Sequence, residues 1–233
     1  MRPSSPDKPA GNSRRVVSNQ PGVHPGLEAR VRRHFAMPWR QPLHAPSTDV
    51  FAALDRLRRE AGADQPIVID AGCGTGESSQ QLAAQHPDAL VIGIDRSAAR
   101  LARSGASEAP RRAGRVLLAR MELTTFWRLA LAEGWPVSHH YLLYPNPWPK
   151  AAQLGRRWHG HPVFPTILAL GGILELRSNW RLYVEEFSLS LGFAGNAEAT
   201  CEEYEVVKPA LTPFERKYHG SGHPLWRLRY KLP

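Results

Sequence analysis

The chain has 233 residues and a formal net charge of +9, with 30 basic and 21 acidic side chains. This length suits one domain with an attached arm, and the charge favours a polyanionic partner such as nucleic acid, unless the arginine-rich composition has no binding role. The two distant cysteines give neither a zinc site nor a disulfide framework, and no apolar run approaches the ~20 residues of a membrane span.

Cysteine usage and the amino-terminal sequence indicate the compartment. Two distant cysteines fit a reducing environment, and the first residues lack the apolar stretch of a signal peptide. We therefore expect a cytoplasmic protein without a membrane or metal requirement, which is a monomer or a weak homodimer.

The first 45 residues differ in composition from the rest. They are rich in Pro, Arg, Ser and Asn, so they cannot bury enough apolar surface to offset the entropy of ordering. We predict a flexible basic arm over residues 1–45, with some order around Leu27–Phe35, and a domain over residues 46–233. The arm either grips a phosphate backbone or is a solvated tail.

A helix and a strand open the predicted domain. Apolar residues at helical spacing predict a helix over Val50–Ala61, with Asp49 as its cap and Gly62 as its end. The β-branched run Ile67–Ile69 predicts a buried parallel strand that ends at Asp70.

A glycine-rich turn follows this strand and leads into a predicted helix over Glu77–Gln85. Gly72, Gly74 and Gly76 permit a tight turn and a close approach of backbone N–H groups to a ligand. The spacing differs from the dinucleotide pattern and no P-loop lysine follows, so ATP and GTP are not expected. A carboxylate at Asp70 suits a cationic or zwitterionic ligand, whereas an ordinary strand–turn–helix would bind nothing.

The next predicted strand, Leu90–Ile94, is followed by Asp95, about 20 residues past the last glycine, where a ribose diol acceptor is expected. Here the chain resembles the class I S-adenosylmethionine-dependent methyltransferases, since residues 70–76 match their first motif and Asp95 their ribose-binding carboxylate. The resemblance implies S-adenosylmethionine as cofactor. It places adenine beside residues 120–122, where a solvated strand end is the alternative. The implied cofactor site comprises Asp70, Gly72, Gly74, Gly76, Asp95, Arg96, Met121, Glu122 and Tyr144.

Further elements continue to the carboxyl terminus, and Thr212–Gly222 is predicted to be a polar loop near the ligand edge. Together they predict an α/β fold: a Rossmann-like, doubly wound seven-stranded sheet, mostly parallel, with a C-terminal antiparallel strand pair. The remaining predicted helices are Ala98–Ser104, Phe126–Ala132, Val163–Leu170 and Tyr183–Leu191. The remaining predicted strands are Gly114–Ala119, His139–Tyr144, Ile173–Arg177, Cys201–Lys208 and Leu225–Tyr230.

Tyr144–Lys150, with the sequence YPNPWPK, is the second informative stretch. Its three prolines fix φ and remove donors, which predicts a stiff exposed loop at a strand end next to the glycine-turn strand. From about Val50 to the carboxyl terminus, the chain resembles the bacterial tRNA (guanine-N7) methyltransferases. That resemblance rests on this loop and on matches at Arg156-Arg157, Arg177–Trp180, Thr212–Glu215 and Gly222–Trp226.

This closer resemblance implies methyl transfer to guanine N7 in tRNA. It gives Asn146 and Asn179 as catalytic positions, although the family has Asp at both. The basic segment of the family is also altered here, to Trp158–His161, whose histidines have no carboxylate or cysteine nearby in sequence to complete a metal site. The implied substrate-binding residues are Asn146, Trp148, Lys150, Arg156, Arg157, Asn179, Thr212 and Glu215.

The chemistry of the acceptor bears on the two asparagines. Guanine N7 carries a lone pair and no proton, so its methylation depends on positioning rather than on a general base. An amide offers one acceptor oxygen and a donor NH₂, so Asn146 could still hold a base, with a different preference. A homologue that binds cofactor or RNA without catalysis, and a methyltransferase acting on a small molecule or a protein, remain open.

Two further sets of side chains have alternative roles. Arg156 and Arg157 face phosphate, help to close the loop, or lie in a solvated connection. Trp148 or Trp158 stacks on a nucleobase or packs against the sheet.

Overall fold

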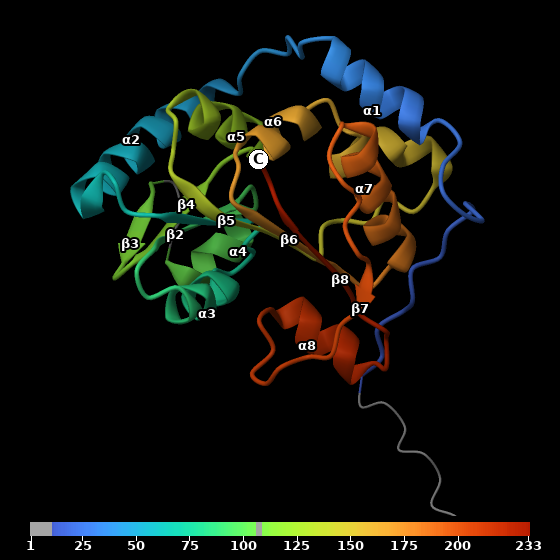
Figure 1. Cartoon of the computed structure of the whole chain (residues 1–233). Coiled ribbons are helices and arrows are strands. Elements are labelled where there is room, and N and C mark those ends of the chain that lie inside the picture. The colour runs from blue at the N-terminus through green and yellow to red at the C-terminus, as the bar shows by residue number, and fades with distance from the viewer. Residues whose placement is uncertain (1–10, 106–108) are drawn as a thin grey trace, which may run out of the picture.

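The computed structural model describes residues 11–105 and 109–233, and within them the chain forms an eight-stranded sheet flanked by helices (Figure 1). The strand order is β3-β4-β2-β1-β5-β6-β8-β7. The five strands from β4 to β6 are parallel, whereas β3 and β8 run antiparallel to their neighbours. The strands are β1 Ile67–Ala71, β2 Leu90–Asp95, β3 Arg111–Ala113, β4 Val116–Arg120, β5 Val137–Leu143, β6 Ile173–Ser178, β7 Glu202–Glu203 and β8 Trp226–Lys231.

The parallel strands place their carboxyl ends at one edge of the sheet. All residues of β1 are buried, as expected for a strand with helices on both faces, and β1 pairs with β2 and β5. Ala71 lies opposite Ile94, and Asp95 lies opposite Arg120. The segments that follow β1, β2 and β4 therefore meet at this edge.

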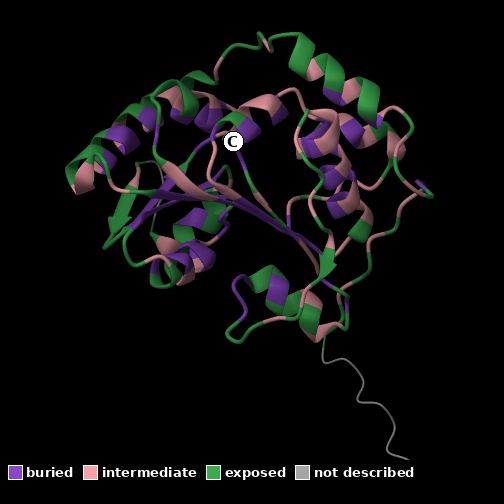
Figure 2. Ribbon diagram, in the orientation of Figure 1, coloured by how far each residue is buried: buried purple, intermediate pink, exposed green. Residues whose placement is uncertain are grey.

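Helices cover both faces of the sheet (Figure 1). Side chains from α1, α2, α5, α6 and α7 form one apolar cluster with Ile67 and Ile69, whereas α3 and α4 pack with Val68 in a second. Figure 2 shows the buried strands between helices whose outer faces are exposed. The helices are α1 Leu27–Ala36, α2 Ala45–Gly62, α3 Glu77–Gln85, α4 Ala98–Leu101, α5 Leu123–Ala132, α6 Phe164–Ala169, α7 Arg181–Phe193 and α8 Pro213–Gly220, with 3-10 turns at Ala102–Ser104, Ala151–Arg156 and Trp158–Gly160.

The doubly wound fold and its C-terminal antiparallel pair are confirmed, and one strand is added. The extra strand, β3, forms a hairpin with β4 through a two-residue turn in which Gly114 has φ +61°. Every residue of β3 is exposed, so no hydrophobic pattern marks it in the sequence.

The region before the last strand departs most from the predictions. The strand expected over Cys201–Lys208 is reduced to Glu202–Glu203, and the polar loop expected over Thr212–Gly222 is helix α8. The Thr212 hydroxyl caps this helix by accepting a hydrogen bond from the Glu215 N–H (2.9 Å). The spacing Thr-x-x-Glu is a helix-start signal that predicts such a cap.

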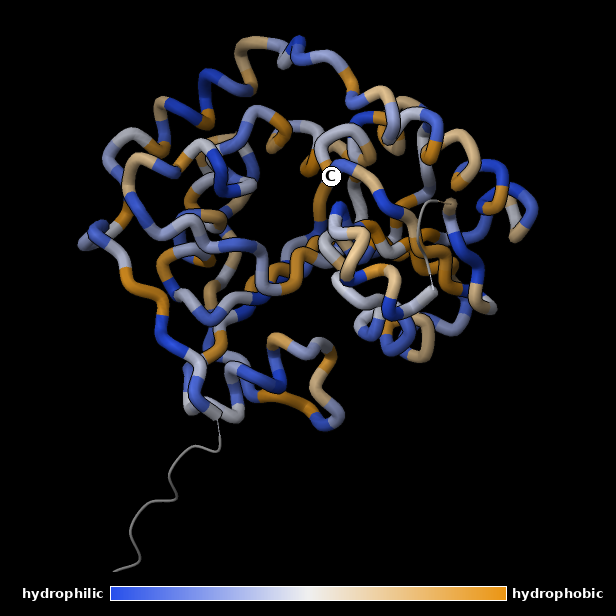
Figure 3. The backbone as a smooth tube through the Cα atoms, turned by 180° about the vertical axis from the view of Figure 1, so that it is seen from behind, coloured by the Kyte–Doolittle hydropathy of each residue, from blue (hydrophilic) through white to orange (hydrophobic). Residues whose placement is uncertain are grey.

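The amino-terminal segment is also more ordered than its composition predicts. Residues 11–26 lie against the domain and lead into α1, and α2 begins at Ala45, before the expected cap Asp49. Seen from behind in Figure 3, this segment runs along the outside of the molecule and is mostly hydrophilic, with one hydrophobic stretch. Helix α1 matches the order expected around Leu27–Phe35. Residues 11–26 contact the domain instead of extending away from it, and residues 1–10 lie outside the described part. No helix in the described ranges combines the length and apolar character needed to cross a membrane.

Candidate active site at the carboxyl edge of the sheet

The glycine turn connects β1 to α3 at this edge. Gly72, Gly74 and Gly76 all have positive φ, at +88°, +61° and +78°, which favours glycine at each position. A Cβ atom on Gly72 would meet nothing within 4 Å, and one on Gly74 would meet only the Arg100 side chain at 3.9 Å. A Cβ on Gly76 would instead lie 2.7 Å from Leu118. The first two glycines thus leave space for a ligand, and the third allows α3 to pack closely on the sheet.

Asp70 lies beneath this turn. Its side chain is 1% exposed, and the hydroxyls of Ser78 and Ser79 donate to its Oδ2 at 2.6 and 2.7 Å. Burial raises the pKa of Asp70 to about 6, against the opposing effect of these hydrogen bonds. Asp70 therefore stabilises the turn from below and places a titratable carboxylate beneath it.

Asp95 binds the glycine turn directly. Its Oδ2 accepts the Gly74 N–H at 3.0 Å and its Oδ1 accepts the Ser97 N–H at 2.7 Å. The half-exposed Arg100 also reaches Oδ2, at 3.4 Å. A ribose diol can use the remaining acceptor capacity of Asp95 once Arg100 swings away, so the carboxylate fits the predicted ligand.

The other predicted cofactor residues lie beside these groups. The Met121 N–H donates to the Asp95 carbonyl at 3.1 Å, but the Met121 side chain is buried in the apolar core. Arg96 lies 3.7 Å from Glu122, and both are partly or largely exposed at the ends of β2 and β4. Only the backbone of Met121 faces this edge, whereas the Arg96–Glu122 pair can flank a nucleoside.

The loop Tyr144–Lys150, called the proline loop below, follows β5 at the same edge. Tyr144 and Trp148 have positive φ of +52° and +45°, which is uncommon for residues with a bulky side chain. Such backbone persists only where its surroundings fix it, and it clusters at functional sites. Between these two residues lies Asn146, which is exposed.

Tyr144 is fixed by a buried network. Its N–H donates to the Arg177 carbonyl at 2.8 Å, and its hydroxyl donates to Glu215 Oε1 at 2.9 Å. Burial and the Glu215 carboxylate raise the pKa of Tyr144 well above its ordinary value, so the phenol stays protonated and donates. Arg177 also binds Glu215, at 2.8 Å.

Glu215 and Thr212 do not line a surface. Glu215 is fully buried, and its second oxygen accepts the Leu211 N–H at 2.6 Å, while Thr212 is 5% exposed and caps α8. A bidentate ion pair between Arg216 and Glu77, at 2.9 and 3.2 Å, joins α8 to the start of α3. The predicted substrate contacts at Thr212 and Glu215 are thus placed where they support α8 and the proline loop.

The two asparagines stand in different surroundings. Among the described residues, the Asn146 side chain makes one long polar contact, with the Trp148 N–H at 3.5 Å. The Asn179 amide donates to His223 Nδ1 at 3.3 Å, and His223 Nε2 donates to the Ser13 carbonyl at 2.9 Å. This chain of contacts requires the Nε2-protonated tautomer of His223, so the amide of Asn179 matches its neighbour as a donor.

The basic residues after the loop divide into exposed and buried ones. Lys150 and Arg156 are exposed, and the Arg156 guanidinium lies 4.7 Å from the centroid of the Trp148 ring. Arg157 is fully buried and its guanidinium contacts the Trp148 carbonyl, so the surface position expected for a direct phosphate contact is not found. Trp158 packs edge-on against Trp127 in the core, with ring centroids 4.7 Å apart, which favours burial over base stacking.

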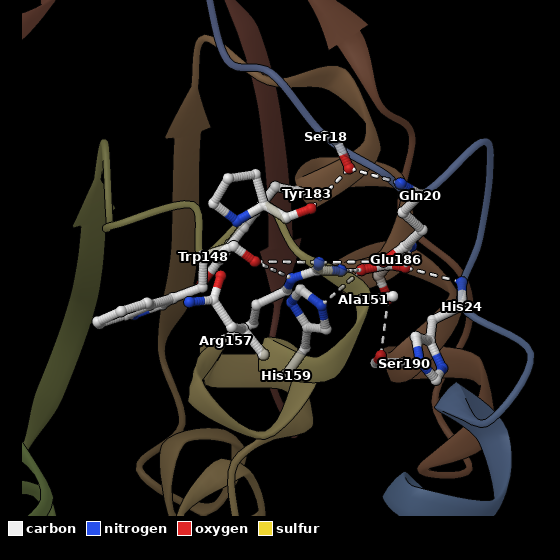
Figure 4. Close-up of polar contacts among 12 residues, drawn as sticks. Ser18, Gln20, His24, Trp148, Ala151, Arg157, His159, Tyr183, Glu186 and Ser190 are labelled. Atoms are coloured by element: carbon white, nitrogen blue, oxygen red, sulfur yellow. Dashed lines mark hydrogen bonds and ion pairs between the residues drawn. The ribbon is translucent and has the colours of Figure 1, made fainter.

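Arg157 is the centre of a network that the sequence analysis missed (Figure 4). It donates to the Trp148 carbonyl through Nε and Nη2, both at 3.1 Å, and pairs with the fully buried Glu186. Burial alone would raise the pKa of Glu186, but His159 and Arg157 lower it to about 2. The network also includes Gln20 of the amino-terminal segment, whereas Glu186 lies on α7. Neither residue belongs to a motif that its spacing in the sequence could identify.

A cavity of about 580 Å³ lies away from this edge, between α3 and the end of the sheet formed by β6 and β8. Its lining includes Tyr141, Glu175, Arg177 and Arg229. Glu175 pairs with both arginines, at 2.6 and 3.1 Å, so these three charges are already matched. It adjoins the site through Arg177 and Leu211, which both bind Glu215. Among the described residues no group of His, Cys, Asp or Glu suits a metal ion.

Comparisons with known proteins cover most of this architecture. A family model described as "Putative methyltransferase" matches residues 64–228, which include the glycine turn, the proline loop and α8. The tRNA (guanine-N(7)-)-methyltransferase of Leifsonia xyli subsp. xyli is 26% identical over 181 residues, covering 73% of this chain and 78% of that protein. The protein of the same name from Halorhodospira halophila is 29% identical over 188 residues, covering 73% and 77%.

A solved structure agrees with the fold. The 16S rRNA methyltransferase KamB has a TM-score of 0.55 to this chain at 18% identity, covering 82% of this chain and 95% of that one. At this identity the likeness is one of fold alone.

Proposed function

Because this chain belongs to the "Putative methyltransferase" family and is a class I S-adenosylmethionine-dependent methyltransferase, we propose that it methylates N7 of a guanine in tRNA. Two relatives named for this activity support the proposal, as does the net charge of +9, which suits a polyanionic substrate. We further propose that the protein acts in the cytoplasm as a monomer or weak homodimer.

The observation that carries the proposal is the strained proline loop beside a glycine turn with open space. Tyr144 and Trp148 hold positive φ on either side of Asn146, and the strand before them, β5, is the direct neighbour of β1. The loop therefore presents Asn146 at the sheet edge that also carries Gly72 and Asp95. A donor site and an acceptor site on one edge are what a methyl transfer between two nucleosides requires.

We propose that the cofactor lies over Gly72 and Gly74. Asp95 would hold its ribose, Asp70 would favour its positive charge from below, and Gly76 would shape the turn. Arg96, the backbone at Met121 and Glu122 would flank its adenine, with Tyr144 at the methyl end. Bound S-adenosylmethionine would supply an electrophilic methyl group to the N7 lone pair; the sulfur–carbon bond would break to leave a neutral thioether, and the guanine ring would take up the positive charge.

No side chain has to remove a proton, because N7 carries none. Asn146 and Asn179 would hold the base so that N7 faces the donor, and catalysis would come from this positioning. Trp148, backed by Arg156, offers an aromatic face to the base or to a neighbouring one. Thr212 and Glu215 would act indirectly, because Thr212 caps α8 and Glu215 fixes Tyr144.

The phosphate backbone would be bound by exposed cations around the loop. Lys150 and Arg156 are both exposed and adjoin Trp148 in the chain or in space. Such contacts fix the register of an RNA without reading its sequence. The specificity for guanine would then rest on the two asparagines.

Incubation of the protein with methyl-labelled S-adenosylmethionine and unmodified tRNA tests this function. We expect label in tRNA, with Asn146→Ala reducing kcat while the affinity for the cofactor stays within a factor of about 2. Gln65→Ala, a substitution at a half-buried side chain near the amino-terminal end of β1, is the matched control. Cofactor binding without transfer to tRNA would instead favour a homologue that lost catalysis or that uses another acceptor.

A further inference from the structure

The amino-terminal segment of residues 11–24, called the strap below, touches both sides of the proposed acceptor site. At one end, Gly11 N–H donates to the Gly220 carbonyl at 2.7 Å and the Ser13 carbonyl accepts from His223, the partner of Asn179. At the other, Ser18 Oγ donates to the Pro149 carbonyl at 2.6 Å. Ser13 and Ser18 are five positions apart, so the strap joins the segment after α8 to the proline loop over at most about 18 Å.

The strap also completes the buried network behind the loop (Figure 4). The Gln20 side chain accepts from Arg157 Nη2 at 3.0 Å and donates to Glu186 Oε1 at 2.5 Å. The His24 N–H donates to the same Glu186 oxygen at 2.9 Å. Gln20 is 8% exposed, and Arg157 and Glu186 are fully buried. One amide thus bridges both members of a buried ion pair.

Arg157 connects this buried network to the proline loop. Its guanidinium fixes the Trp148 carbonyl through two hydrogen bonds, and Trp148 is one of the two residues with strained backbone next to Asn146. A residue in such a conformation needs a surrounding that fixes it. Removal of one partner from a buried charged network leaves its other members short of hydrogen bonds, so they move to recover them.

We propose that Gln20 is a positioning residue for methyl transfer, acting through Arg157 to hold the proline loop in the conformation that presents Asn146. The strap is then a working part of the active site rather than an appendage. Asn19 adds to this hold, because its Oδ1 accepts the Ala151 N–H at 3.0 Å. The inference rests on the proposed function for its kinetic part and on the structure alone for its mechanical part.

Gln20→Met tests the proposal, because it keeps the shape of the side chain and removes its three hydrogen bonds, to Arg157, to Glu186 and to the Gly22 carbonyl. We expect kcat on tRNA to fall by about 10- to 100-fold, since a displacement of ~1 Å at a reacting centre costs up to that factor. The affinity for S-adenosylmethionine should stay within about twofold, because the glycine turn lies on other strands. Amide hydrogen exchange over residues 150–157 should accelerate.

Two further variants keep the test decisive. Ser18→Ala removes the hydrogen bond to the Pro149 carbonyl and the acceptor of the Gln20 N–H, and it should show the same pattern more weakly, even if Gln20→Met folds poorly. Gln65→Met makes the same chemical change at a half-buried position near the amino-terminal end of β1 and should leave kcat and the exchange of residues 150–157 unchanged.

The proposal is overturned if both strap variants lower only the melting temperature and keep the wild-type kcat and the wild-type amide exchange of residues 150–157. If the wild-type protein transfers no methyl group to tRNA, the proposed function fails. The exchange experiment still decides whether the strap holds the loop, so the two failures are distinguishable.

Discussion

Single residues at the glycine turn have separable tasks. Asp95 is 4% exposed and faces the turn and the ligand side, whereas Asp70 lies below the turn and is bound by two serine hydroxyls. The first can bind a ligand directly and the second acts through its charge. Because the two carboxylates differ in this way, substitutions and pH should affect them differently.

Asp95→Asn should weaken binding of S-adenosylmethionine by about 10- to 100-fold, because hydrogen bonds to a charged group contribute about 1.5–3 kcal/mol. The half-exposed Arg100 competes for the same carboxylate at 3.4 Å, so Arg100→Ala should bind the cofactor at least as well as the wild type. Isothermal titration calorimetry measures both variants. Unchanged affinity in Asp95→Asn would remove this residue from the cofactor site.

The pKa of Asp70 gives a pH dependence with a defined sign. Burial raises this pKa to about 6, so the carboxyl is largely neutral at about pH 5 and ionised at about pH 7. A cationic ligand favours the ionised form, so its affinity should rise by up to about tenfold over this range. S-adenosylhomocysteine, which lacks the sulfonium charge, is the control and should show a smaller rise. Equal rises for both ligands would contradict this role for Asp70.

At the scale of elements, α8 determines the shape of the acceptor side. Its first turn is capped by Thr212, its Glu215 fixes Tyr144 and Arg177, and its Arg216 binds Glu77 at the start of α3. These contacts connect the end of the chain to the glycine turn and to the proline loop. Disturbance of the helix start should therefore reach both.

Thr212→Ala should lower the free energy of unfolding by about 1 kcal/mol, the usual value of a lost N-cap. The reason is that the Glu215 N–H loses its acceptor at a buried site. Urea denaturation followed by circular dichroism measures the change. Thr48→Ala, at a half-buried position in the first turn of α2 whose hydroxyl makes one long contact at 3.5 Å, is the matched control and should change stability by less than half as much. A wild-type midpoint for Thr212→Ala would contradict the capping role.

The elements differ in how well the sequence specifies them. β1 and β2 could be predicted because strands buried on both faces are continuous apolar runs, and the glycines of the turn identify the loop between β1 and α3. β3 could not, because its residues are exposed and only the hairpin with β4 orders them. Helix α8 could have been found from Thr212 and Glu215, whose spacing is a capping signal.

The candidate site shows the same division. Gly72, Asp95 and Asn146 could be placed at one edge from the order of strands and motifs. The burial of Arg157 could not be predicted, because an arginine pair in a loop is usually exposed, and only the distant Gln20 and Glu186 make burial possible. The positive φ of Tyr144 and Trp148 is likewise set by tertiary contacts that have no local signal.

At the scale of the whole molecule, the charge of +9 should appear in the binding of RNA. Affinity for tRNA should fall steeply between about 50 mM and 200 mM salt, because phosphate contacts release counterions. The double variant Lys150→Ala with Arg156→Ala should reduce the slope of log K against log salt by about 1 to 2. Fluorescence anisotropy with labelled tRNA measures it.

The matched control for this experiment is Arg112→Ala. This exposed arginine lies on β3, the outermost strand of the sheet on the side away from β5 and the proline loop. It should leave the slope unchanged if the RNA lies over the proline loop. An equal loss of slope in both variants would mean that RNA binding follows total charge rather than the candidate site.

Mass analysis of the nucleosides of unmodified tRNA, after incubation with the protein and S-adenosylmethionine, tests the central claim most directly. If the open glycine turn and the strained loop around Asn146 together form a site for N7 methylation, 7-methylguanosine accumulates with time and Asn146→Ala slows its formation. If the cofactor binds but no methylated guanosine forms, or the methyl group appears on another base or on no RNA at all, the account is contradicted.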